Sequence, residues 1–277
     1  MLLLLGGEKV ADYRFRFPRG VKKAFTLSYD DGQVFDRRLV DMFDRYHLKA
    51  TFHLNSGTLG CGNEKDEFIK PDEVEELYDG HEVSAHGVNH PYFCQLSDGM
   101  VLDEIYNDKL KLEEYSASIV RGMSYPFGEF SDRVINIAMA AGMEYSRTVN
   151  DTKDFNIPDD FMRWNPSCHH NDADKLLDRF LNPQSYQDLL LFYVWGHSFE
   201  FDRENTWDMM EEFCKKISGH EDVWYATNIE IKDYISAMRS VRASADQKRL
   251  YNPSGFNIYL EYNNKIYVIG PNETITL

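Results

Sequence analysis

Short apolar runs rich in strand-forming residues alternate along the chain with stretches in which apolar residues recur every three or four positions. The first pattern predicts buried strands and the second predicts amphipathic helices. The predicted strands cover residues 24–29, 50–54, 82–85, 122–125, 145–149, 189–195 and 223–227. The predicted helices cover residues 37–46, 72–78, 102–118, 132–141, 173–181, 206–217 and 229–240. This alternation indicates βα units built around a parallel sheet.

The number of strands and a change of pattern near residue 240 predict the overall organisation. About seven strands in a chain of 277 residues favour a closed or nearly closed barrel over an open sheet. After residue 240, strand formers alternate at 257–262 and 265–269 across the turn Asn263-Asn264, which predicts a β-hairpin. We therefore expect a barrel over residues 1–240 and a small β extension over residues 241–277.

Residues capable of catalysis follow several of the predicted strands. Asp30 and Asp31 end the first strand, His86 follows the third, and His197 follows the sixth. His90 stands four positions after His86, in a segment whose glycine and proline indicate a loop. The carboxyl ends of barrel strands share one rim, so we expect these side chains to lie together.

This set of side chains predicts a metal-dependent hydrolase. Two imidazoles and a carboxylate are the ligands of an open catalytic zinc-type site, and a second carboxylate beside them can act as a general base. A histidine on the same rim, here His197, is placed to protonate a leaving group. Taken singly, each signal has a plainer interpretation: a solvated Asp-Asp-Gly turn, two surface histidines, and a histidine packed in the core.

Composition narrows the classes of partner. The formal net charge is −16, which argues against nucleic acid and anionic membranes as partners. The four cysteines form no CxxC pair, so we do not expect a thiolate zinc site. We expect the cysteines to be free thiols. The leucine run in residues 1–7 is too short for a signal peptide and lacks a basic segment before it. We expect a cytoplasmic protein as the sequence is written, and an extracytoplasmic one if a leader has been removed.

Four motifs in the predicted order carry a family resemblance. They are Ser28-Tyr29-Asp30-Asp31, the pair His86 and His90, Tyr125-Pro126-Phe127-Gly128, and the apolar run from Leu191 to His197. With these motifs the chain resembles the polysaccharide deacetylases of the NodB-homology type, carbohydrate esterase family 4, over about residues 20–240. The resemblance implies a distorted (β/α) barrel of about seven parallel strands, acting on an acetylated carbohydrate.

The resemblance also implies roles for individual residues. The divalent metal would be held by Asp31, His86 and His90, with zinc as the preferred ion and cobalt, manganese or nickel as alternatives. Asp30 would be the general base, His197 the general acid, and the backbone amide of Phe127 a donor to the oxyanion. The other expected substrate-site residues are Tyr125, Pro126 and Trp164.

The chain departs from the family pattern at the arginine that braces the base. Ser124 occupies its position, two residues before Pro126. Arg163 is the first candidate to supply the missing guanidinium, and Arg121 is a weaker one. Gly87 also replaces the hydroxyl residue that usually follows the first metal-binding histidine.

The acidic residue that orients the histidine acid has no clear match either. Trp164 marks the place of that motif, and Asp151 or Asp154 is the candidate partner for His197.

Two other functions stay open beside deacetylation of an N- or O-acetylated sugar. One is hydrolysis of a small non-sugar amide on the same fold. The other is carbohydrate binding without catalysis, which the missing arginine favours. The sequence gives no indication of oligomeric state.

Overall fold

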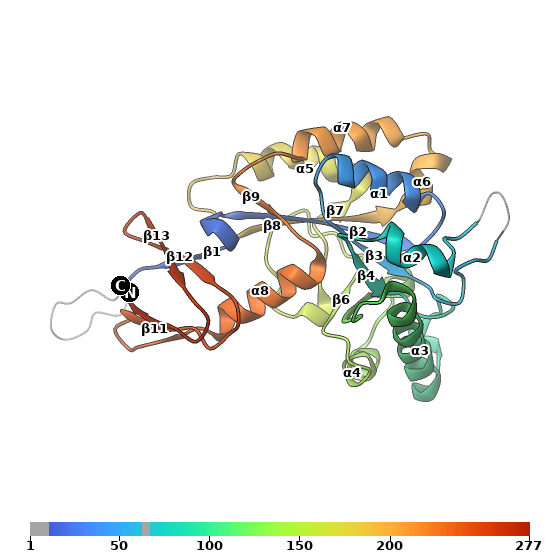
Figure 1. Ribbon diagram of the computed structural model, residues 1–277, viewed down its shortest axis with the longest axis horizontal. Helices are drawn as coiled ribbons and strands as arrows, with labels where there is room; N and C mark the ends of the chain where they lie inside the picture. The colour runs from blue at the N-terminus through green and yellow to red at the C-terminus, as the bar shows by residue number, and fades with distance from the viewer. Residues whose placement is uncertain (1–10, 63–66) are drawn as a thin grey trace.

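A curved parallel β-sheet forms the centre of the molecule, for which a computed structural model describes residues 11–62 and 67–277 (Figure 1). Its strands are β2 (Lys23–Asp31), β3 (Ala50–Leu54), β4 (Glu82–Ala85), β5 (Gly122–Ser124), β6 (Tyr145–Arg147), β7 (Cys168–His169), β8 (Leu190–His197) and β9 (Val223–Tyr225). Seven of them follow the order β6-β5-β4-β3-β2-β8-β7, and β9 pairs with the beginning of β2. All pairings within this sheet are parallel.

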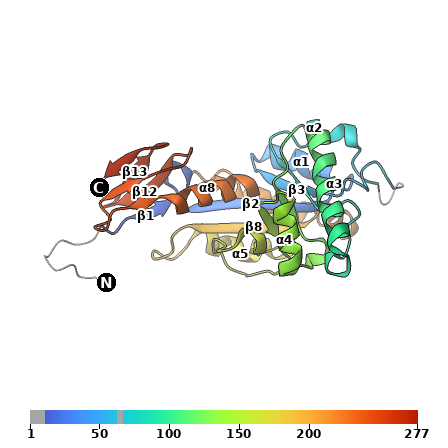
Figure 2. The same ribbon diagram turned by 90° about the horizontal axis from the view of Figure 1, so that it is seen from below.

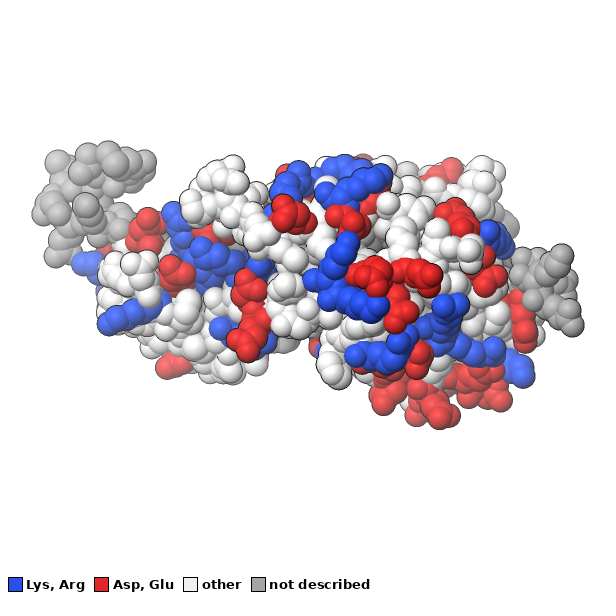
Figure 3. Space-filling view, turned by 90° about the horizontal axis from the view of Figure 1, so that it is seen from above, with Lys and Arg blue, Asp and Glu red and all other residues white. Residues whose placement is uncertain are grey.

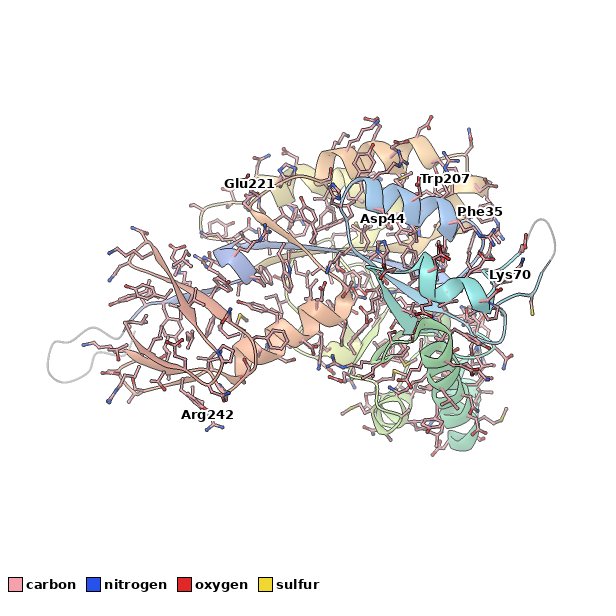
Figure 4. The ribbon with its side chains drawn as sticks, viewed as in Figure 1. Phe35, Asp44, Lys70, Trp207, Glu221 and Arg242 are labelled. Carbon is pink, nitrogen blue, oxygen red and sulfur yellow. The ribbon has the colours of Figure 1, made fainter. Side chains whose placement is uncertain are left out.

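Helices cover the sheet. They are α1 (Asp36–Arg45), α2 (Val74–Leu77), α3 (Asp98–Ser116), α4 (Asp132–Ala140), α5 (Ala173–Leu181), α6 (Ser198–Arg203), α7 (Trp207–Ile217) and α8 (Asn228–Ser240). Figure 1 shows α1, α5 and α7 over one face of the sheet and α8 on the opposite side. The Trp207 ring, labelled in Figure 4, packs 5.1 Å from the Phe201 ring and so joins the second half of α6 to the start of α7. Within residues 11–62 and 67–277, no helix combines the length and the apolar character needed to cross a bilayer.

The alternation of side chains along β2 separates a hydrophobic layer from a polar interior. The odd-numbered residues from 25 to 29 are aromatic or aliphatic and join the larger hydrophobic core. The even-numbered residues from 26 to 30 are polar, buried and on the opposite face of the strand. Thr26 there donates a hydrogen bond to Asn228 Oδ1 at 3.0 Å. The same two-residue alternation therefore places Asp30 in a polar interior, where charged partners can reach it.

Irregular backbone fills the space between β6 and β8. The Trp164 amide donates to the Ser146 carbonyl (3.1 Å), and the Thr148 amide donates to the Trp164 carbonyl (3.0 Å). Three residues further on, the Ser167 amide donates to the Tyr193 carbonyl of β8 (2.8 Å). The expected distorted (β/α) barrel is confirmed, with eight parallel strands among the described residues where about seven were expected and with this segment in place of a regular closing strand.

The C-terminal part of the chain forms two small antiparallel sheets at one end of the molecule (Figure 2). Their strands are β1 (Arg14–Arg16), β10 (Arg242–Ala243), β11 (Arg249–Tyr251), β12 (Ile258–Tyr262), β13 (Lys265–Ile269) and β14 (Thr274–Thr276). The predicted hairpin is confirmed: β12 and β13 pair across Asn263 and Asn264, whose φ angles of 50° and 59° fit a type I′ turn. β1 from the N-terminal part pairs with β12, which was not predicted. The division at residue 240 stays a prediction.

The surface over α1, α5 and α7 mixes both signs of charge. Figure 3 shows this face, with lysine and arginine interspersed among aspartate and glutamate. Arg45 of α1 pairs with Glu211 of α7 at 3.1 Å, and Lys216 of α7 pairs with Asp174 of α5 at 2.6 Å. Such exposed pairs contribute about 0–1 kcal/mol each, so these pairs add little to the stability of the helical layer.

Most predicted elements are found within a few residues of their predicted ends. Ser131 caps α4, its side chain accepting from the Val134 amide, and Gly142 follows that helix with a φ of +87°. The short strands β1, β7, β10 and β11 and the six-residue helix α6 were not predicted. The four cysteines are free, as expected. The leucine run in residues 1–7 lies outside the described residues.

Candidate active site

The predicted metal ligands meet at the carboxyl end of the sheet. Asp31 Oδ1 lies 3.7 Å from Nε2 of both His86 and His90. Asp31 ends β2 with a φ of +81°, a conformation in which the usual alternation breaks and both adjacent carboxylates can face the same site. The three predicted ligands are therefore together, within 4.8 Å of one another.

Hydrogen bonds fix the ring of His86. Its Nδ1 lies 3.0 Å from the Ser124 carbonyl and 2.6 Å from Ser124 Oγ, and both contacts fit a proton on Nδ1. The His86 amide donates to Asp108 Oδ2 at 2.9 Å, and Asn55 Nδ2 donates to the His86 carbonyl at 2.7 Å. Burial lowers the pKa of His86 to about 3, so the ring is neutral and Nε2 is free to bind a cation.

The loop that carries both histidines depends on Gly87. Its φ is +76°, and a Cβ there would lie 3.0 Å from Pro91 Cδ and 3.2 Å from Phe93 Cζ. A serine or threonine at this position would combine strain with crowding. The observed conformation of this loop therefore requires a glycine at position 87.

The residues present fit a divalent cation. Asp31 Oδ1 is buried and has no hydrogen-bond donor, although a buried carboxylate oxygen without a partner is costly. Burial raises the pKa of Asp31, and the neighbouring Asp30 carboxylate adds to the effect. A cation between Asp31 Oδ1 and the two imidazole nitrogens would remove both penalties. One carboxylate and two imidazoles also match the donors that zinc and similar ions prefer.

Arg147 braces the proposed base, Asp30. Its guanidinium Nη2 pairs with Asp30 Oδ2, and both side chains are almost completely buried. Ser124 Oγ donates to Asp30 Oδ1 at 3.2 Å, so the residue at the expected arginine position bonds both Asp30 and His86. Burial disfavours the Asp30 carboxylate, but Arg147, His86 and His53 together outweigh it and hold the pKa of Asp30 well below its ordinary value.

The two arginines suggested by the sequence lie elsewhere, which corrects that prediction. Arg163 is on the surface, where it pairs with Asp160 and Asp132. Arg121 pairs with Glu144 at 2.6 Å and with Asp233 at 2.7 Å. Both guanidiniums are occupied by other carboxylates and do not serve Asp30.

His197 lies beside Asp30, because the two residues occupy paired positions of β8 and β2. Its Nδ1 contacts Glu200 Oε1 at 2.9 Å, where Glu200 is in the first turn of α6. Burial works against the charged ring, but Glu200, Asp30 and Asp31 together raise the pKa of His197. Glu200 therefore takes the orienting position that the sequence analysis gave to Asp151 or Asp154.

Asp151 and Asp154 have other partners. Asp151 accepts a hydrogen bond from Trp195 Nε1 at 2.8 Å, and Asp154 accepts from the Phe155 amide at 2.9 Å.

The aromatic residues expected at the substrate site divide into two groups. The Trp164 side chain is buried and packs 4.8 Å from the Tyr193 ring, and the buried Tyr125 donates to the Met162 carbonyl at 2.9 Å. Trp164 and Tyr125 thus pack the barrel instead of presenting their rings to a substrate, as does the buried Pro126. Phe127 is half exposed.

Phe127 and Tyr92 form an open aromatic surface at the rim. Their rings stack at 3.8 Å with an interplanar angle of 4°, and the Phe127 ring lies 4.3 Å from the His90 ring. The role of the Phe127 amide as oxyanion donor stays a prediction.

Comparisons with known proteins agree with this geometry. The sequence model of the family described as polysaccharide deacetylase matches residues 18–146. This segment belongs to the polysaccharide deacetylase family. It contains the predicted metal ligands, Asp30 and the motif around Phe127, whereas Arg147, His197 and Glu200 lie beyond it.

Individual deacetylase relatives are distant. Chitin deacetylase 1 of Cryptococcus neoformans is 26% identical over 148 residues, which are 49% of this chain and 30% of that protein. The chain spans between about a third and about half of the curated relatives it matches.

Solved structures support the fold. A protein from Mycobacterium smegmatis assigned to the polysaccharide deacetylases superimposes with a TM-score of 0.60 at 16% identity, over 84% of this chain and 96% of that one. A carbohydrate esterase family 4 pseudoenzyme from Bacillus anthracis gives a TM-score of 0.50 at 19% identity, over 76% of this chain and 66% of that one. These likenesses concern the deacetylase fold alone.

Proposed function

We propose that the protein is a metal-dependent hydrolase that removes N-acetyl groups from a carbohydrate, releasing acetate and a free amine. The observation that carries this proposal is the buried Asp31 oxygen without a hydrogen-bond donor, facing two imidazole nitrogens at 3.7 Å. A second carboxylate, Asp30, and a third imidazole, His197, stand beside this group in paired positions of adjacent strands.

Asp31, His86 and His90 would hold the cation, with zinc as the preferred ion and cobalt, manganese or nickel as alternatives. When bound, such an ion supplies Lewis acidity that polarises a carbonyl and lowers the pKa of water. Residues of this chain carry out the proton transfers and stabilise the oxyanion.

Asp30 takes the proton of the water that attacks the acetyl carbonyl carbon. Its Oδ2 is held by Arg147 and its Oδ1 by Ser124, which fixes the carboxylate beside Asp31. Because Arg147 keeps the pKa of Asp30 low, the carboxylate is ionised at neutral pH and carries no proton of its own.

His197 protonates the sugar nitrogen as the bond between carbon and nitrogen breaks. Glu200 Oε1 accepts a hydrogen bond from His197 Nδ1, which leaves Nε2 to donate its proton to the leaving group. A raised pKa keeps a larger share of the ring protonated near neutral pH, as an acid needs. The Phe127 amide would stabilise the oxyanion, a contact worth about 2.7–4 kcal/mol.

An N-acetylated sugar is the substrate class that the relatives and the rim favour. One relative bears the name chitin deacetylase, and chitin is a polymer of acetamido sugars. The stacked Phe127 and Tyr92 rings offer a flat apolar face beside His90, which suits the face of a sugar ring.

The test is acetate release from N-acetyl chito-oligosaccharides by zinc-loaded protein. Asp30→Asn should keep its metal and lose at least about 100-fold in rate, the lower end of what general acid–base catalysis contributes. Asp174→Asn on the exposed surface of α5 is the control and should match the wild type. A wild-type rate in Asp30→Asn would refute the assignment of the base. Hydrolysis of small cyclic amides but not sugars would point to an amidohydrolase, and metal binding without any hydrolysis to a non-catalytic protein.

A further inference from the structure

A second group of metal-ligating side chains lies on the other side of His197. It consists of His169 at the end of β7, His170 directly after it, and Glu200 in α6. We propose that His169 Nε2, His170 Nε2 and Glu200 Oε2 bind a second divalent cation of the zinc type. This site is separate from the one formed by Asp31, His86 and His90, and it does not depend on the proposed hydrolysis.

The ligand atoms approach one another without forming hydrogen bonds. Glu200 Oε2 lies 2.9 Å from His169 Nε2 and 3.1 Å from His170 Nε2. Even so, neither the Oε2 atom nor the two ring nitrogens of His170 have a hydrogen-bond partner among the described residues. The atoms are close but poorly directed at each other, which is the arrangement expected of ligands that converge on an ion between them.

The pocket around His170 holds its ring in one orientation. The His170 side chain is fully buried, 4.2 Å from the Phe201 ring and stacked at 15° over Tyr29. A Cβ on Gly196 would lie 2.0 Å from His170 Nδ1, so only glycine at that position of β8 leaves room for the ring. A buried imidazole without hydrogen bonds is costly, by about 1–3 kcal/mol per unpaired group, and a bound cation at Nε2 would offset this.

The spacing is compatible with zinc, while the poor direction of the contacts argues against a hydrogen-bonded network. Zinc–ligand bonds of about 2.0–2.1 Å at tetrahedral angles place neighbouring ligand atoms about 3.3 Å apart. The observed 2.9 Å and 3.1 Å lie slightly below that value, and the 3.7 Å of the first site lies slightly above it. Two imidazoles and one carboxylate leave a fourth position open, and the partial exposure of His169 and Glu200 gives the ion a way in from solvent.

One contact opposes the cation weakly. The Asn171 amide points at His169 Nδ1 across 3.4 Å, whereas metal binding at Nε2 needs the proton on Nδ1. At that length the hydrogen bond is marginal, so giving it up costs little beside a metal–ligand bond.

The second site would also fix the orientation of His197. The other oxygen of Glu200 contacts His197 Nδ1 at 2.9 Å, so one carboxylate joins the proposed cation to His197. A cation on Oε2 would fix the carboxylate plane and with it the orientation of the His197 ring.

Metal content per chain tests the proposal directly. The full chain is loaded with Zn²⁺, freed of excess metal by gel filtration, and analysed by mass spectrometry for bound zinc. We expect about two ions in the wild type and about one in His170→Phe, whose ring still fills the space between Tyr29 and Phe201. His220→Phe, on the loop after α7, is the matched control and should keep two.

Asp31→Asn keeps the test decisive if His170→Phe does not fold. In Asp31→Asn the remaining ion should give anomalous scattering at the zinc edge between His169, His170 and Glu200. Crystals of this variant without a peak there, or zinc content unchanged in folded His170→Phe, would overturn the second site. Zinc lost in His170→Phe but unaffected by Asp31→Asn would support the second site while contradicting the proposed hydrolase centre.

Discussion

The ion pair between Arg147 and Asp30 gives the sharpest prediction for stability. Both side chains are almost completely buried, and the guanidinium also lies 4.5 Å over the Trp195 ring. Replacing Arg147 with Met leaves the Asp30 carboxylate buried without its counter-charge, which typically costs about 3–5 kcal/mol. Arg163→Met is the control, because Arg163 pairs with Asp160 and Asp132 on the surface and its loss should cost about 0–1 kcal/mol.

Denaturant unfolding at neutral pH measures both values. The free energy of unfolding should fall by about 3–5 kcal/mol in Arg147→Met and by no more than about 1 kcal/mol in Arg163→Met. In Asp30→Asn the charge that Arg147 compensates is already gone, so adding Arg147→Met should cost about 2 kcal/mol less than it does alone. Equal losses in the two arginine variants, or fully additive effects in the double variant, would refute the assignment of Arg147 as the bracing residue.

Three further predictions concern other parts of the molecule. Burial raises the pKa of Glu82 to about 7. The contribution of Glu82 to stability is therefore complete at a pH below the ordinary pKa of glutamate and is lost as the pH rises toward 7. Between pH 5 and pH 8, the free energy of unfolding should fall by roughly 3 kcal/mol more in the wild type than in Glu82→Gln. Parallel pH profiles of the two proteins would contradict this. If the stack of Tyr92 with Phe127 contributes about 1.4 kcal/mol to sugar binding, Tyr92→Ala should raise KM for chito-oligosaccharides by about tenfold with little change in kcat. An unchanged KM would exclude this contribution of the stack. Gly196→Ala should displace the His170 ring, lowering the melting temperature by several degrees, and an unchanged melting temperature would mean that the ring moves freely.

The sequence predicted those parts of the site that are encoded locally. Asp30 and Asp31 end an apolar run and His86 follows another, so the strand pattern alone places them on one rim. Glu200 could also have been found, because it stands three positions after His197 in a segment that is helical.

Arg147 could not have been assigned in the same way. It reaches Asp30 from β6, which is separated from β2 in the sheet by β5, β4 and β3. The contact therefore depends on the curvature of the barrel, and strand periodicity carries no information about that. Trp164 shows the same limit, since its position near the rim in sequence did not reveal that its ring is buried inside.

The pairing of β1 with β12 has a consequence for how the protein is made. Arg16 and its ion-pair partner Glu261 are separated by 245 residues. At about 5–20 residues per second, roughly 12 to 50 seconds pass during translation before the partner strand of β1 is synthesised. For that time the ribosome-bound chain carries an open strand edge that invites wrong pairing. Refolding of the complete protein should accordingly be more efficient than folding of any nascent form that stops before β12.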